Sequence, residues 1–131
     1  MKPCLLFPLL MLAAPAMAQD TSPDALIAQY SAETGTVPSP DRGKSLFLAD
    51  DHTGGKPDTP SCTTCHTDDP RGMGKARTGK TIEPMAPSAN PARFTDSAKV
   101  EKWFGRNCDS VLGRPCTAGE KADIIAWLTS L

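Results

Sequence analysis

The sequence has no excess of charge of either sign. It contains 14 Lys and Arg residues against 15 Asp and Glu residues in a chain of 131, a formal net charge of −1 at pH 7. A nearly neutral surface gives no electrostatic reason to bind nucleic acid or an anionic membrane. The alternating pattern of a β-strand, an internal repeat and a low-complexity tract are also missing from the sequence. The missing strand pattern favours an all-α fold, and the missing repeats favour a single small domain.

The sequence also has no apolar run of transmembrane length, although its N-terminus is apolar. The run Cys4–Ala14 follows a short positive start, and Ala16-Met17-Ala18 places small residues where a signal peptidase recognises them. Because the run is too short to span a bilayer as a helix, we expect residues 1–18 to be a secretory signal peptide, not an uncleaved anchor. Cleavage would leave residues 19–131 as one domain in the periplasm.

Four helices are predicted, each from a capping residue followed by apolar residues at helical spacing. They begin at Ser22-Pro23, at Ser39-Pro40, at Thr95 or Asp96, and at Thr117, where Glu120 completes a capping box. The segments 50–61 and 67–93 are rich in glycine and proline, and we expect loops there. A loop as long as 67–93 is uncommon in a small domain unless it wraps a cofactor that replaces part of the core.

One motif in the middle of the chain carries the chemistry. Cys62-Thr63-Thr64-Cys65-His66 is the pattern to which haem c is attached. Two thiols at this spacing reach the two vinyl groups of the haem, and the histidine that follows is held next to the iron as an axial ligand. We therefore predict one covalent haem c, bound by Cys62 and Cys65, with His66 on the iron. No catalytic residue is predicted.

Three other interpretations of the motif compete with haem attachment. A redox-active cysteine pair would need a strand-to-helix setting, whereas the flanks of the motif are rich in glycine and proline. A zinc site built from four cysteines would need Cys108 and Cys116, which lack the usual zinc spacing, and an oxidising compartment disfavours free thiolates. A chance occurrence of the pattern is the third.

Cys108 and Cys116 form a second pair. We expect a disulfide that closes the short loop Asp109–Pro115 between the third and the last predicted helix, because unpaired thiols in an exported protein are exposed to oxidation. Two separate buried thiols are the alternative.

The second axial position of the iron is left open by the motif. Small c-type cytochromes commonly place a methionine there, and Met73 and Met85 are the candidates downstream of the motif. His52 is the other histidine, and it precedes the motif. Spacing along the chain favours Met85.

Several longer segments resemble the sphaeroides haem protein family, oxygen-binding cytochromes of the class I c-type fold. The similarity covers essentially all of residues 20–131. It is carried by the segments Gly54–His66, Arg93–Ala98, Val100–Trp103, Gly105–Cys108 and Gly119–Asp123.

This resemblance implies a second axial ligand other than methionine. In the family, an asparagine directly before a disulfide cysteine holds the sixth position of the iron, and the matching residue is Asn107. The family disulfide corresponds to Cys108 and Cys116. Met85 departs from the family, which has leucine there, and adds a competing soft ligand. Without the resemblance, Asn107 would be interpreted as a C-terminal helix cap.

The resemblance also implies a helix crossing and an electron donor. Gly43 and Phe47 match residues at a helix crossing, with Ile124 and Trp127 opposite them. A small dihaem cytochrome c is the implied electron donor. Many class I cytochromes have a proline after Thr-Gly in the loop that supports the axial histidine. Here Lys80 follows Thr78-Gly79, so we expect other residues to support His66.

An amide oxygen is a hard, weak ligand that tolerates ferric iron and has little affinity for ferrous iron. We therefore hypothesise that Asn107 is released on reduction, so that oxygen or another diatomic gas can bind.

Two functions compete with electron transfer coupled to gas binding. One is a simple electron carrier with Met85 always on the iron. The other is a haem enzyme that acts on oxygen, peroxide or nitric oxide.

Overall fold

The computed structural model describes residues 19–131, so the predicted signal peptide lies outside the described residues. The helices are α1 (Pro23–Thr34), α2 (Pro40–Leu48), α3 (Thr63–His66), α4 (Ser97–Leu112) and α5 (Ala118–Thr129), and the strands are β1 (Gly74–Lys75) and β2 (Thr81–Ile82). The predicted all-α class is confirmed, with one short hairpin added. Across this range, each helix falls short of the length and apolarity that a membrane span requires.

The predicted caps begin four of the helices. In each case the capping side chain accepts a hydrogen bond from a backbone N–H in the first turn, which satisfies a group that the helix itself leaves unpaired. The caps are Ser22 of α1, Ser39 of α2, Asp96 of α4 and Thr117 of α5. Thr117 and Glu120 form the reciprocal capping box.

Helix α4 is longer than predicted. The expected loop from Asp109 is helical as far as Leu112, and Gly113, with φ of 67°, ends the helix in the left-handed conformation. Asn107 consequently lies inside α4 and is not its C-terminal cap, so that interpretation of the asparagine is wrong. The disulfide loop begins one turn later than expected.

Two short elements were not predicted. The haem-attachment motif forms the single turn α3, and β1 and β2 pair antiparallel, with Gly74 opposite Ile82 and Lys75 opposite Thr81. Strands of two residues cannot display an alternating pattern, so the sequence contains no signal for them. The rest of segment 67–93 is turns and loop, as predicted.

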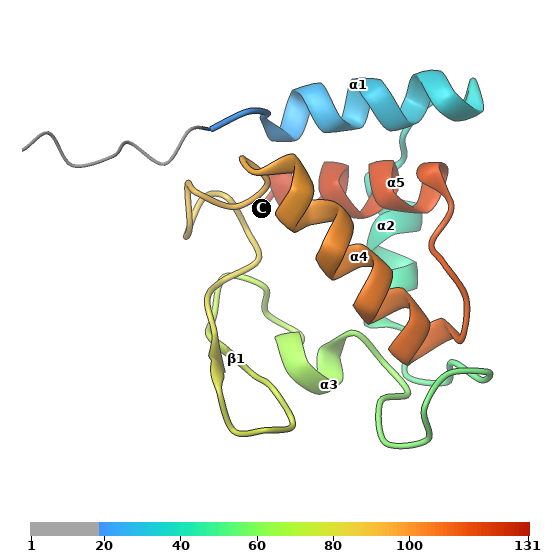
Figure 1. Ribbon diagram of the computed structural model, residues 1–131, viewed down its shortest axis with the longest axis vertical. Coiled ribbons are helices and arrows are strands. Elements are labelled where there is room, and N and C mark those ends of the chain that lie inside the picture. The colour runs from blue at the N-terminus through green and yellow to red at the C-terminus, as the bar shows by residue number, and fades with distance from the viewer. Residues whose placement is uncertain (1–18) are drawn as a thin grey trace, which may run out of the picture.

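The apolar core is formed where α5 packs against α1 and α2 (Figure 1). At Gly43 of α2, an added Cβ would lie 2.0 Å from the carbonyl oxygen of Asp123, so the two backbones touch and only glycine fits. The rings of Phe47 and Trp127 pack against each other beside this crossing in a tilted arrangement, with centroids 5.2 Å apart. The crossing implied by the resemblance is therefore present, between α2 and α5.

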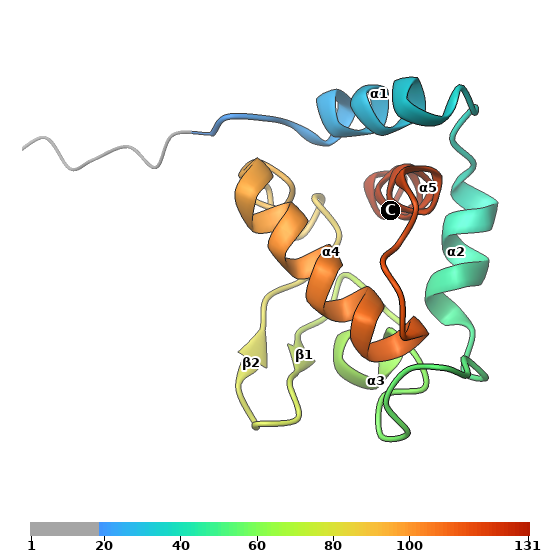
Figure 2. The ribbon, with the colours of Figure 1, turned by 45° about the vertical axis from the view of Figure 1, so that its right-hand side comes forward.

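Helix α4 connects this core to the rest of the molecule. Both views show α4 running from the end where α1 and α5 lie towards α3, with the β1–β2 hairpin beside α3 (Figures 1 and 2). The side of α4 that faces inwards carries Val100, Cys108 and Val111, which are buried. The C-terminal end of α4, α3 and the hairpin therefore lie together at one end of the domain (Figures 1 and 2).

Candidate functional site

The turn α3 brings the side chains of the motif together, because residues three and four positions apart lie on the same side of a helix. Ser61 holds the start of this turn. Its hydroxyl accepts a hydrogen bond from the backbone N–H of Thr63 at 3.2 Å, and the residue is only 4% exposed. Cys62 and Cys65 are half-buried and free. Burial raises the pKa of the Cys62 thiol to about 11, so it is neutral at pH 7.

His66 is the ring that this turn presents to the interior. Its Nδ1 atom is buried and has no hydrogen-bond partner within residues 19–131. Burial, together with the nearby positive charge of Arg93, lowers the pKa of His66 to about 4. The imidazole is therefore neutral at pH 7, the form that can donate a lone pair to a metal. The ring of Phe47 lies at a centroid distance of 6.0 Å.

A cavity of about 670 Å³ lies against this turn. Its size falls in the range of small-molecule sites in proteins. Cys62, Cys65 and His66 all line it, and the buried rings and branched side chains of Phe94, Val100, Val111 and Ile124 make up much of its wall.

Both candidates for the second axial ligand line this cavity. Asn107 reaches it from α4 and Met85 from the loop 67–93, and both are half-buried. The backbone around Met85 is tied to the motif, because the N–H groups of Met85 and Ala86 donate to the carbonyl oxygen of Pro70, at 2.8 and 3.0 Å. Pro70 follows His66 by four residues. The loop that carries Met85 is therefore bonded to the segment that follows the motif, whereas Asn107 comes from α4.

The other two candidates lie elsewhere. Met73 is 51% exposed and does not line the cavity. His52 is half-buried, and its Nε2 lies 3.0 Å from the carbonyl oxygen of Leu46. Neither side chain is placed to ligate an iron held by His66.

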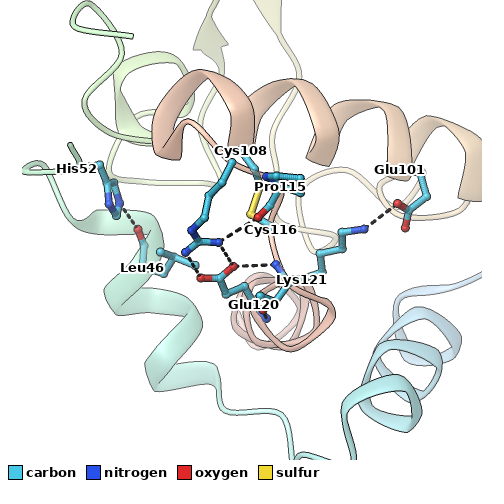
Figure 3. Close-up of a disulfide and its surroundings, with 10 residues drawn as sticks. Leu46, His52, Glu101, Cys108, Pro115, Cys116, Glu120 and Lys121 are labelled. Atoms are coloured by element: carbon cyan, nitrogen blue, oxygen red, sulfur yellow. Dashed lines mark hydrogen bonds and ion pairs between the residues drawn. A yellow bond between two sulfur atoms is a disulfide. The ribbon is translucent and has the colours of Figure 1, made fainter. Parts of the chain in front are cut away.

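The disulfide joins Cys108 of α4 to Cys116, which precedes α5 (Figure 3). The two Cα atoms are 5.5 Å apart, and both residues are buried and line the cavity. Within residues 19–131, no three His, Cys, Asp or Glu side chains gather in a group that could hold a metal ion. The four cysteines therefore form two separate pairs, which disfavours the zinc interpretation.

A contact that sequence reasoning missed joins α4 to the loop before the motif. The hydroxyl of Thr59 donates to the carbonyl oxygen of Ser110 at 2.9 Å, and the Lys56 N–H donates to the same oxygen at 2.7 Å. A Cβ added at Gly113 would lie 1.9 Å from the carbonyl oxygen of Gly54. These glycines were the available signal, because close backbone approach requires them. We call these contacts the α4 brace: they fix the last turn of α4 against the segment that leads into Cys62.

Arg93 is a half-buried cation whose guanidinium is bonded to backbone carbonyl groups. Its Nε donates to the carbonyl oxygen of Pro84 at 3.0 Å, and its Nη2 donates to that of Glu83 at 2.6 Å. The guanidinium is half-buried, lines the cavity and takes part in none of the ion pairs found within the described range. Burial lowers the pKa of Arg93. A partly buried cation without a carboxylate suits a cavity that receives an anionic group.

These features together fit a covalently attached haem. The cavity is apolar, two free thiols line it, and so does a neutral imidazole with an unpaired buried nitrogen. Arg93 adds a cation for a propionate, and Asn107 and Met85 add candidate ligands. A redox-active cysteine pair alone would explain neither the cavity nor Arg93.

Comparisons with known sequences agree with this assignment. Residues 33–128 match the model of the family described as a domain of unknown function, DUF1924. The chain is 63% identical over 119 residues to the cytochrome c-type protein SHP of Cereibacter sphaeroides, covering 91% of this chain and 92% of that protein. It is 48% identical over 69 residues to cytochrome c″ of Methylophilus methylotrophus, covering 52% of this chain and 48% of that protein.

Solved structures show the same relation in three dimensions. The structure of oxidised SHP, described as an oxygen-binding cytochrome c, aligns with a TM-score of 0.82 at 62% identity, over 86% of this chain and 99% of that one. Oxidised cytochrome c″ of Methylophilus methylotrophus aligns with a TM-score of 0.66 at 37% identity, over 82% of this chain and 93% of that one. A solution structure of the same cytochrome c″, described in terms of haem-ligand detachment, gives a TM-score of 0.68 at 36% identity, over 83% and 93%.

Proposed function

The chain belongs to the family of the cytochrome c-type protein SHP, and from this membership we propose that it is a periplasmic monohaem cytochrome that transfers electrons and binds oxygen or another diatomic gas. Cys62 and Cys65 would hold the haem through thioether bonds, and His66 would ligate its iron. The haem supplies an iron that accepts one electron and, in the ferrous state, a diatomic ligand.

The observation that carries the proposal is the arrangement of ligands around the cavity. Asn107 reaches the cavity from α4 and lines it together with Cys62, Cys65 and His66. This position supports the proposal that Asn107 would be the second ligand, as the family resemblance implies. Its amide oxygen would hold ferric iron and leave ferrous iron, because a hard neutral oxygen binds the softer ion weakly. Release of Asn107 would open one position to a gas.

An optical experiment tests the proposal directly. We expect the dithionite-reduced holoprotein to show a high-spin, five-coordinate spectrum that changes at once when carbon monoxide is added. A low-spin ferrous spectrum that does not respond to carbon monoxide would contradict gas binding.

A simple electron carrier is the second candidate, favoured by the position of Met85 in the cavity wall. A thioether is a soft ligand that retains ferrous iron, so Met85 on the iron would leave no open position. The same carbon monoxide experiment separates the two functions.

The proposed cellular setting rests on the sequence. Residues 1–18 would direct export and be removed, leaving residues 19–131 in the periplasm. A dihaem cytochrome c is the proposed electron donor, as the family resemblance implies.

A further inference from the structure

One side of α4 carries positive charge next to the cavity. Lys99, Lys102, Trp103 and Arg106 are exposed and spaced so that they share one side of the helix. We call this set the basic face of α4. Glu101 lies on a different side of the helix, where its carboxylate pairs with Lys121 at 2.7 Å.

The three cations of the basic face are available to a partner. Five other cations of the described residues are neutralised in ion pairs with acidic side chains, namely Arg42, Arg71, Arg77, Arg114 and Lys121. Lys99, Lys102 and Arg106 take part in none of these pairs. Their charge is therefore directed to solvent, although the whole chain carries a slight negative charge.

Trp103 connects this charge to the cavity. It is 46% exposed, and the cationic groups of Lys102 and Arg106 lie 5.7 and 5.5 Å from its ring centroid. Trp103 and Lys99 also line the cavity. A residue that borders both solvent and cavity offers a short path for an electron between a docked protein and a haem.

We propose that the basic face of α4 is the surface on which an electron-donating protein docks through an acidic patch. Exposed tryptophan and arginine side chains are the residue types that most often anchor protein interfaces. The three cations would orient the partner and accelerate its encounter, because opposite charges steer association. The local patch is needed for this, since the net charge of the chain would not attract an acidic protein. This inference rests on the proposed electron-transfer function.

The test uses the ferric holoprotein and reduced flavodoxin, a small electron-transfer protein with an acidic surface, as the probe. One electron passes from the flavodoxin, which is oxidised, to the ferric haem, which becomes ferrous. We expect the bimolecular rate constant to fall as ionic strength rises from about 0.01 to 1 M, where the screening length shortens from about 30 to 3 Å. The variant Lys102→Gln/Arg106→Gln, which keeps the cavity-lining Lys99, should be several-fold slower at low salt and less sensitive to salt.

A matched control uses a cation elsewhere on the surface. Lys44 on α2 is exposed and unpaired in the described structure, so Lys44→Gln removes the same charge as Lys102→Gln from a different helix. Docking on α4 predicts that Lys102→Gln slows flavodoxin more than Lys44→Gln does. Equal effects of the two variants, or a rate independent of salt, would overturn the docking proposal.

A neutral reductant separates this proposal from the proposed function. Photoreduced lumiflavin, an uncharged donor of low potential, should reduce the wild type and the Lys102→Gln/Arg106→Gln variant at similar, salt-independent rates, because no charged surface is involved. If lumiflavin fails to reduce the wild type, the electron-transfer function itself is wrong. If lumiflavin reduces the variant as much more slowly as flavodoxin does, the substitutions have perturbed the haem site and the docking proposal is overturned.

Discussion

At the scale of single residues, the identity of the axial ligand depends on how two side chains are attached to the fold. Asn107 projects from the interior of a 16-residue helix, whereas Met85 belongs to a loop whose backbone is bonded to Pro70. Spacing along the sequence favoured Met85, and the family resemblance supplied Asn107. Both side chains line the cavity, so the spacing alone could not decide between them.

Substitution of the two candidate ligands should give different results. Asn107→Ala should change the ferric spectrum and raise the affinity for azide roughly tenfold or more, because the internal competitor for the iron is removed. Met85→Leu should leave both properties close to the wild type. Azide titration of the ferric protein measures the affinity, and an unchanged Asn107→Ala variant beside an altered Met85→Leu variant would reverse the assignment.

Arg93 should influence the reduction potential. A cation beside the haem disfavours the ferric state, so Arg93→Gln should lower the potential by roughly 50–100 mV, equivalent to 1–2 kcal/mol for a partly buried charge. Arg93→Lys should retain part of the effect. Lys80→Gln is the control, because Lys80 is exposed in the turn of the hairpin. Redox titration measures the shift, and equal shifts for Arg93→Gln and Lys80→Gln would exclude a specific role.

At the scale of elements, the helix starts could be predicted and some of the ends could not. The caps of α1, α2, α4 and α5 are local, so a few neighbouring residues define them. The end of α4 depends on Gly113 meeting Gly54, a contact between segments far apart in the sequence. Single-turn α3 and the two-residue strands are too short to show any period.

Alanine substitutions at two helix-ending glycines, one inside the α4 brace and one outside it, test whether the brace is rigid. Gly35 and Gly113 end α1 and α4 with φ of 66° and 67°, but only Gly113 is crowded by another backbone, while Gly35 has no atom within 4 Å of an added Cβ. Gly35→Ala should cost about 1–2 kcal/mol for the left-handed conformation. Gly113→Ala should cost about 1–3 kcal/mol more, because the Gly54 carbonyl must move. Denaturant unfolding of the holoproteins measures both, and equal losses would show that the brace is not rigid.

At the scale of the whole molecule, one end of the domain is an ordinary apolar core and the other end is a cavity. The core among α1, α2 and α5 was predictable from apolar spacing, and the family resemblance implied the crossing at Gly43. The position of the cavity was not predictable, because its walls come from α3, α4 and a loop without periodic structure. A cofactor must supply the missing interior at that end.

Loss of haem attachment should therefore affect the whole domain. We expect Cys62→Ala/Cys65→Ala to lose the cooperative thermal transition and to bind a hydrophobic dye, the behaviour of a compact state without fixed packing. Thr64→Ala is the control, since Thr64 is exposed in the same turn and offers no thiol. Circular dichroism during heating measures the transition. A cooperative transition near that of the holoprotein would show that the cavity end folds unaided.

The α4 brace and the disulfide have a consequence for timing. The C-terminal part of α4 is bonded to the loop before Cys62 through Ser110 and to Cys116 through Cys108, and both connections oppose a shift of the backbone at Asn107 along the helix axis. If Asn107 leaves the iron, it does so by turning about its own side-chain bonds. A side-chain rotation is faster than a movement of helices. A gas could then bind without waiting for the helices to rearrange.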